Sequence, residues 1–206
     1  MPTLEYKKTR ILETSGKLFM TYGFKRVSME EIARNAGVGK GTVYQLFESK
    51  QDLMLSTIDY ISEQIGGTIN SIMNDNGIPP IEKLRLFIKT VSGRLSNLRT
   101  SALSDLEIDF PEGYEKIRRK RQELIFGNLT ELLQQGKRAG IYNPQINEAL
   151  AAHVVIGAIT QVTQAEVLST FTCSPDQIFQ SILNIVLQGC LLPEYRDRLH
   201  KEIAET

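Results

Sequence analysis

The stretch of sequence that decides the fold reads Ile32-Ala33-Arg34-Asn35-Ala36-Gly37-Val38-Gly39-Lys40-Gly41-Thr42-Val43-Tyr44. It predicts two short helices joined by a tight turn at Gly37, because a left-handed backbone there would strain other residues. Ser28-Met29-Glu30-Glu31 precedes it and has the spacing of a capping box, which marks the start of the first helix. Ala33 is small enough for the second helix to cross closely over the first. The pattern is that of a helix-turn-helix.

Apolar spacing predicts which side of the second short helix faces outward. The residues spaced to be buried between the two helices are Ile32, Val38, Val43 and Leu46. The residues left at the start and on the outer face of the second helix are Lys40, Gly41, Thr42, Tyr44 and Gln45. A recognition helix presents this part to the major groove of DNA. The alternative is a tight helical corner inside a bundle, but no acidic residue precedes Glu48 on this face.

Charge is unevenly distributed along the chain. Residues 1–50 carry nine Lys or Arg and five Asp or Glu, a net charge of +4, so the other 156 residues carry −4. A basic end on an acidic protein suits contact with a polyanion. Lys50 opens the next helix, where its ammonium group and the free amides of the helix start are expected to meet a phosphate.

Composition predicts a folded protein of the cytoplasm. Of the 206 residues, 41% are hydrophobic and 23% are charged, as in ordinary globular domains. No apolar run approaches the roughly 20 residues of a membrane-spanning helix, and the N-terminus lacks a secretory signal. Cys173 and Cys190 lie among apolar neighbours, which favours buried free thiols over a disulfide.

Helical spacing recurs along almost the whole chain and predicts an all-α protein. About nine helices are expected, over residues 5–22, 28–36, 40–47, 50–74, 80–98, 100–108, 112–138, 144–170 and 175–192. We predict a helix-turn-helix domain over residues 1–50 and a larger helical domain over residues 51–206.

With these residues in place, the sequence resembles the tetracycline-repressor (TetR) family of transcriptional regulators. The detailed resemblance covers about residues 8–55, and the rest agrees only in helix number, length and order. The matching residues are Leu18, Phe19, Tyr22, Gly23, Phe24, Ser28, Ile32, Ala33, Ala36, Gly37, Val38, Gly41, Thr42, Tyr44, Phe47, Lys50 and Leu53. Ser28 stands where the family has threonine, which keeps the capping hydroxyl.

The resemblance implies a DNA-binding set of Ser28, Gly39, Lys40, Gly41, Thr42, Tyr44, Gln45 and Lys50. Lys40, Gly41 and Thr42 occupy positions that reach base edges, and Lys40 suits guanine. Ser28, Tyr44, Gln45 and Lys50 occupy positions that contact phosphates, which set the register. The implied partners are double-stranded operator DNA, a small-molecule inducer of unknown identity and a second copy of the chain; no membrane is implied.

Pairing between copies is expected through the last two long helices. Both are apolar around more of their circumference than a one-sided surface helix requires. The predicted interface residues are Ala152, Ile156, Ile159, Ile178, Ile182 and Ile185. The alternative is that these helices form the core of a single chain.

The resemblance places an inducer pocket among the helices of residues 50–138. Its predicted lining is Tyr60, Gln64, Phe87, Phe110, Tyr114, Phe126 and Gln161, although for any one of these aromatic residues the pattern favours an ordinary core position over a ligand contact. The basic run Arg118-Arg119-Lys120-Arg121 is interpreted as a solvated helix face rather than an anion site, since consecutive residues point in different directions.

An enzyme is the main alternative from another class. The chain has two histidines, His153 and His200, without the spacing of metal ligands, and it lacks nucleophile-elbow, phosphate-loop and Cys-x-x-Cys patterns. We therefore expect no catalytic residue, no metal and no cofactor. An architectural DNA binder is a further alternative, but it would not require such a large second domain.

Overall fold

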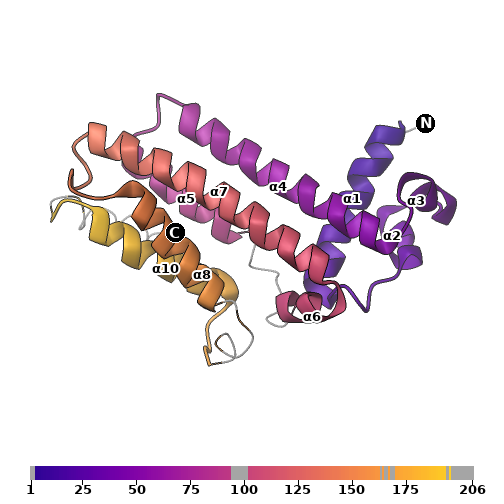
Figure 1. Cartoon of the computed structure of the whole chain (residues 1–206). Coiled ribbons are helices and arrows are strands. Elements are labelled where there is room, and N and C mark those ends of the chain that lie inside the picture. The colour runs from indigo at the N-terminus through magenta and orange to yellow at the C-terminus, as the bar shows by residue number, and fades with distance from the viewer. Residues whose placement is uncertain are drawn as a thin grey trace. The chain divides into compact units, whose positions relative to one another are not determined.

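The computed structural model describes residues 3–93, 102–162, 164, 167, 170–193 and 195. Within these ranges the chain forms nine α-helices and no β-strand, which confirms the predicted all-α class (Figure 1). The helices are α1 (Leu4–Tyr22), α2 (Met29–Ala36), α3 (Lys40–Leu46), α4 (Lys50–Asn74), α5 (Pro80–Gly93), α6 (Ala102–Asp109), α7 (Pro111–Arg138), α8 (Glu148–Val162) and α10 (Pro175–Cys190). None of these described helices is long and apolar enough to cross a membrane.

The ends of the first helices lie where the sequence predicts them, because local groups satisfy the terminal backbone. Ser28 Oγ accepts a hydrogen bond from the Glu31 amide at 3.1 Å and thereby caps α2. Gly23 and Gly37 end α1 and α2 with φ values of 83° and 67°. Only a residue without a Cβ adopts such values readily, so both glycines are required by the turns.

Helix α8 begins at Glu148, later than the predicted start at residue 144. The Asn143 amide donates to the Cys190 carbonyl at 3.0 Å, which draws this segment into a turn beside the end of α10. Asn147 Oδ1 then accepts an amide of the first turn at 2.9 Å, so Asn147 caps α8. The predicted continuation of α5 to residue 98 lies outside the described residues.

Packing divides the chain into two compact units, which we call the first unit and the second unit. The first unit comprises Met1–Gln64 with Asn97–Arg121, and the second unit comprises Ile65–Ser96 with Gln122–Thr206. The predicted boundary after residue 50 separates the proposed DNA-binding segment from the rest of the chain. This functional division stays a prediction.

The first unit has an apolar core formed where α1, α2 and α3 pack with the start of α4. Its deeply buried side chains include Ile11, Ile32, Val43, Phe47 and Leu53. Gly16 lets α1 and α4 approach closely, since a Cβ there would lie 2.8 Å from Cδ1 of Ile61. This core fixes α3 from its inner side and leaves its polar residues on the surface.

The second unit has its own core, contributed by the end of α4 and by α5, α7, α8 and α10. Its deeply buried side chains include Phe87, Leu129, Leu133, Tyr142 and Leu183. The ring of Tyr142 packs beside Gly136 of α7, where an added Cβ would overlap it. Lys83 is buried and donates to the Met73 carbonyl at 2.6 Å, which satisfies a carbonyl in the last turn of α4.

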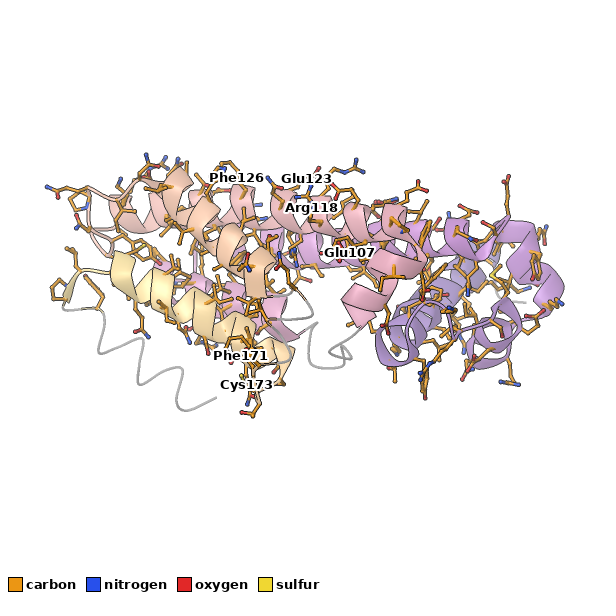
Figure 2. All side chains as sticks on the ribbon, turned by 60° about the horizontal axis from the view of Figure 1, so that its bottom comes forward. Glu107, Arg118, Glu123, Phe126, Phe171 and Cys173 are labelled. Atoms are coloured by element: carbon orange, nitrogen blue, oxygen red, sulfur yellow. The ribbon has the colours of Figure 1, made fainter. Side chains whose placement is uncertain are left out.

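Both cysteines are free thiols, as predicted, but only one is buried. Cys190 lies in the core of the second unit, whereas Cys173 is exposed. Cys173 and Phe171 belong to the short connection that precedes α10, and both side chains reach solvent (Figure 2). The prediction for Cys173 was wrong because apolar neighbours in sequence do not bury a residue that lies in an exposed connection.

Candidate nucleic-acid interface

The turn between α2 and α3 has the geometry that a helix-turn-helix requires. Gly37 adopts the left-handed conformation, and its amide donates to carbonyls at the end of α2. The Val38 amide donates to the Ala33 carbonyl at 3.0 Å and closes the turn. Ala33 and Ala36 are almost wholly buried, so a side chain larger than alanine at either position would overpack the core around α2.

The structure leaves the outer face of α3 open. Gly39, Lys40, Gly41, Tyr44 and Gln45 are exposed. Thr42 is half-buried, and Val43 is fully buried on the opposite side of the helix. A Cβ built on Gly41 would meet nothing within 4 Å. The first unit itself therefore sets no steric requirement for glycine at this position.

Lys40, the first residue of α3, has two neighbours near its ammonium group. Its Nζ lies 2.5 Å from Oε1 of Glu30 in α2 and 5.7 Å from the ring centroid of Tyr44. The hydrogen bond from Lys40 lowers the pKa of the Glu30 carboxyl, and the same contact raises the pKa of Lys40. Both groups therefore stay charged at neutral pH. Sequence analysis did not single out Glu30, because the contact joins two different helices.

The ammonium group of Lys50 is bound by backbone carbonyls of the protein. Its Nζ donates to the carbonyls of Phe24 at 3.0 Å, Lys25 at 3.4 Å and Val27 at 3.1 Å. Burial lowers the pKa of Lys50, with a weaker opposing effect from Asp109. The ammonium group thus stabilises the segment that joins α1 to α2, and the phosphate contact predicted for Lys50 stays a prediction.

The same connecting segment is also contacted by the end of α6. The ring of Phe110 stacks on that of Phe24, with the centroids 5.2 Å apart. Lys25 and Asp109 form an ion pair at 3.7 Å. An open groove of about 270 Å³ lies here, lined by Tyr22, Gly23, Phe24, Lys25, Arg26, Asp105, Ile108 and Asp109. Sequence analysis missed this groove because its walls come from segments far apart in the chain.

The residues predicted to line an inducer pocket fall in both units. Tyr60, Phe110 and Tyr114 pack in the apolar cluster of the first unit. Gln64 also belongs to the first unit. In the second unit, Phe87 is fully buried in the core, whereas the ring of Phe126 packs edge-on against that of His153, with the centroids 4.9 Å apart. Gln161 is exposed and donates to Gln164. The pocket assignment stays a prediction.

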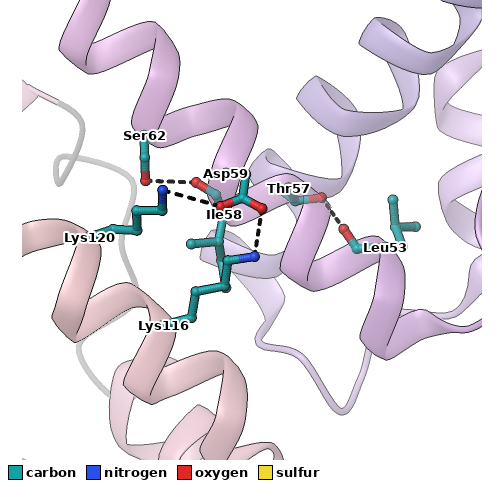
Figure 3. A network of polar contacts seen from close by, with 7 residues as sticks. All are labelled: Leu53, Thr57, Ile58, Asp59, Ser62, Lys116 and Lys120. Atoms are coloured by element: carbon teal, nitrogen blue, oxygen red, sulfur yellow. Dashed lines mark hydrogen bonds and ion pairs between the residues drawn. The ribbon is translucent and has the colours of Figure 1, made fainter.

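The basic run on α7 is divided among different partners. Arg118 pairs with Glu115 of the same helix at 2.7 Å. Lys120 lies 3.5 Å from Asp59 of α4, which also pairs with Lys116 at 2.6 Å (Figure 3). Arg118 and Lys120 therefore have different partners and do not converge on one point.

The predicted interface residues lie on different sides of α8 and α10. Those buried in the core of the second unit are Ala152, Ile159 and Ile178. Ile156 and Ile182 are partly buried against the same core. Ile185 is 75% exposed and is the one member of the set that points freely into solvent. Its interface role stays a prediction, whereas the three buried residues face the interior of their own chain.

Comparison with known proteins identifies the class to which this fold and helix-turn-helix belong. Residues 11–57 match the family model described as bacterial regulatory proteins, tetR family. The uncharacterized HTH-type transcriptional regulator YerO of Bacillus subtilis is 40% identical over 83 residues, which cover 38% of this chain and 28% of that protein. The fatty acid metabolism regulator protein of B. subtilis is 23% identical over 188 residues, or 89% of this chain and 95% of that protein.

Two solved structures share the fold over most of their length. The fatty acid degradation regulator FadR of Bacillus halodurans superposes with a TM-score of 0.63 at 22% identity and covers 87% of this chain and 97% of its own. FadR of B. subtilis in complex with stearoyl-CoA gives a TM-score of 0.62 at 21% identity, over 86% and 96% of the two chains. The segment that contains the helix-turn-helix therefore matches the tetR family of bacterial regulatory proteins, and these solved structures share the fold of the chain.

Proposed function

We propose that this protein represses transcription by binding a palindromic operator as a homodimer, and that a small-molecule inducer releases it. One observation carries the DNA-binding part of the proposal. The first turn of α3 is exposed, contains no acidic residue and presents Lys40 beside Gly41, and no described atom of the chain lies close enough to Gly41 to require a glycine there. The small residue serves the close approach of another molecule, and a duplex fits that role.

Two kinds of contact divide the work at this surface. Lys40 and Thr42 are assigned to base edges in the major groove, with Lys40 donating to guanine O6 and N7. Ser28, Tyr44 and Gln45 are exposed around them and are assigned to phosphates, which fix the register but carry no sequence information. Gly39 and Gly41 allow the backbone of α3 to approach the groove.

A second copy is proposed to bind across the outward faces of α8 and α10. Large apolar side chains exposed on these faces are Leu150, Val154 and Ile185, with exposed fractions of 62%, 50% and 75%. Gly157 and Gly189 are also exposed, and a Cβ at either would meet nothing within 4 Å, so a partner helix has room to approach. Small and apolar residues together on two adjacent helices favour a packed four-helix interface.

The inducer is proposed to act by population shift. A ligand that binds better to one arrangement of the dimer lowers operator affinity by its differential affinity for the two states. Stearoyl-CoA is the first probe, because a structural relative was solved with that ligand and a full-length relative is named for fatty acid metabolism. A ligand that binds tightly and leaves operator affinity unchanged would contradict induction.

The other function classes have less support. No group of His, Cys, Asp and Glu suited to a metal ion occurs within the described part of the chain, and the relatives reported above are named as regulators. An architectural DNA binder would use the same face but would not prefer a palindrome. Because the proposed target is chromosomal DNA, we assign the protein to the cytoplasm.

The test is selection of bound duplexes from a random pool by the purified full chain. A palindromic motif with half-sites about one helical turn apart is expected for a dimer. The Lys40→Ala variant should bind the selected duplex roughly tenfold or more weakly and lose preference at one base position of each half-site. Recovery of no motif from the pool would exclude the proposed function, and equal losses on selected and random DNA would exclude the assigned role of Lys40.

A further inference from the structure

We infer that Glu30 determines specificity in this protein, because its carboxylate holds Lys40 for base reading and disfavours DNA bound through phosphates alone. The inference rests on the proposed function. It adds a residue of α2, a helix that precedes the recognition helix, to the set that decides which duplex is bound. It also assigns this role to an acidic group, whereas the predicted DNA-binding set contains none.

The ammonium group of Lys40 contacts a carboxylate and lies near an aromatic ring. Glu30 Oε1 lies 2.5 Å from Nζ, and the centroid of the Tyr44 ring lies 5.7 Å from it. A free lysine is a flexible point charge, and ordering it at a base edge opposes binding. Here the side chain is ordered before DNA arrives, since it bridges α2 and α3.

The ammonium group retains the capacity to read a base while it is paired. A lysine has three N–H donors, and Glu30 uses one direction of approach. The side chains of Lys40 and Glu30 are 59% and 54% exposed, so a guanine edge has access to the remaining donors. The pair is therefore compatible with base recognition, and one group need not displace the other.

A stabilising role for the fold does not account for this pair. Exposed ion pairs contribute little to folding. A cation at the start of a helix is also unfavourable with respect to the helix dipole, and α3 has no side-chain cap at Gly39 to offset it. The Glu30 carboxylate lies beside Lys40 on the face where DNA is proposed to bind, so its charge also acts on a bound duplex.

The negative charge acts differently on the two kinds of complex. Binding without sequence preference depends on attraction between basic side chains and phosphates. Glu30 opposes this attraction, because its carboxylate repels phosphates and pairs with the ammonium group of Lys40. Binding at the operator adds base contacts, which an oriented Lys40 makes more readily. Glu30 thereby widens the difference between operator and random DNA. The lowered pKa of Glu30, caused mainly by the hydrogen bond from Lys40, keeps the carboxylate charged at neutral pH.

The experiment compares Glu30→Gln with Glu31→Gln in the full chain. Glu31 is the adjacent residue of α2 and carries the same charge, but it does not pair with Lys40. Affinities are measured for the duplex that the wild type selects and for a scrambled duplex of equal length. We expect Glu30→Gln to lower the ratio of the two affinities by about two- to fivefold, mainly through tighter binding of the scrambled duplex. Glu31→Gln should leave the ratio unchanged.

Two further variants separate positioning from charge. Glu30→Asp keeps the charge but withdraws the carboxylate from Lys40, so it should weaken operator binding without strengthening binding to the scrambled duplex. In a Lys40→Ala background, Glu30→Gln should change both affinities by the same factor. If the wild type selects no motif, the proposed function fails. If it selects one, but Glu30→Gln shifts both duplexes equally or Glu31→Gln reproduces its effect, this inference alone is overturned.

Discussion

The ammonium group of Lys50 lies over the ring of Phe24, 4.4 Å from its centroid, and donates to the Phe24 carbonyl at 3.0 Å. The cation therefore contacts the π face and the backbone of one residue together. It joins the first turn of α4 to the segment between α1 and α2, on which the position of the helix-turn-helix depends. A residue that the sequence assigned to phosphate binding thus connects two parts of the first unit.

The Lys50→Met variant tests this role. Methionine keeps the length of the side chain but loses the donors, so the free energy of unfolding should fall by about 1 kcal/mol or more, as measured by urea denaturation. The slope of log K against log salt for operator binding shows whether Lys50 also contacts a phosphate, because an unchanged slope would contradict that contact. A phosphate contact by Lys50 would instead reduce that slope by about 0.9. Lys17→Met, an exposed site on α1, is the control for the change in charge.

The Ile185→Glu variant tests the proposed interface. A buried, unpaired carboxylate in the contact between two copies would oppose association, so the protein should become monomeric at micromolar concentration. Sedimentation equilibrium measures the mass. Ile108→Glu is the matched control, because Ile108 is an isoleucine of α6 that is 81% exposed and lies off the proposed face. A dimer that persists in Ile185→Glu, or a monomeric wild type, contradicts the interface.

Two glycines of α7 should respond in opposite ways to alanine. Gly136→Ala would place a Cβ within the ring of Tyr142, and the overpacking should destabilise the protein by about 1–3 kcal/mol or more. Gly127→Ala meets nothing within 4 Å and should stabilise it by roughly 0.5–1 kcal/mol, since alanine favours the helix. Urea denaturation of the two variants checks both signs. Equal effects would show that Tyr142 does not occupy this position.

The buried hydroxyl of Tyr142 predicts an alkaline loss of stability. Burial raises the pKa of Tyr142 above its ordinary value, because the phenolate is poorly solvated in the core. The unfolded chain releases this proton near pH 10 and the folded chain only at higher pH, so stability is retained below pH 10 and falls as the pH rises further. Tyr142→Phe should make that decline shallower, as followed by thermal unfolding between pH 8 and 11.

The stability of Tyr142→Phe at neutral pH tests whether the hydroxyl is satisfied. The Tyr142 hydroxyl has no hydrogen-bond partner among the residues that the structure describes. Its replacement by hydrogen should therefore leave stability unchanged or raise it. A clear loss of stability in Tyr142→Phe at pH 7 would mean that the hydroxyl is satisfied in solution.

The helices and their ends were predictable because their signals are local. The caps at Ser28 and Gly37 act within one turn of the chain, and the structure places both as expected. The start of α8 was misjudged because Asn143 is drawn into a turn by a contact with Cys190, which is far away in sequence, so that Asn147 caps the helix instead. The candidate interface shows the same contrast. Exposure of α3 followed from apolar spacing, but the pairing of Lys40 with Glu30 did not.

The amino-acid sequence by itself determined the all-α class, the helix-turn-helix at residues 28–47 and the side of α3 that faces solvent, because helical periodicity and capping are properties of neighbouring residues. Only the tertiary structure decided which apolar faces of α8 and α10 are buried in the core, where Ile159 lies inside and Ile185 is exposed. It also decided that Lys50 is taken up by backbone carbonyls and that Glu30 holds Lys40. These outcomes depend on side chains from different helices meeting in space, and helical spacing carries no information about which helices will meet.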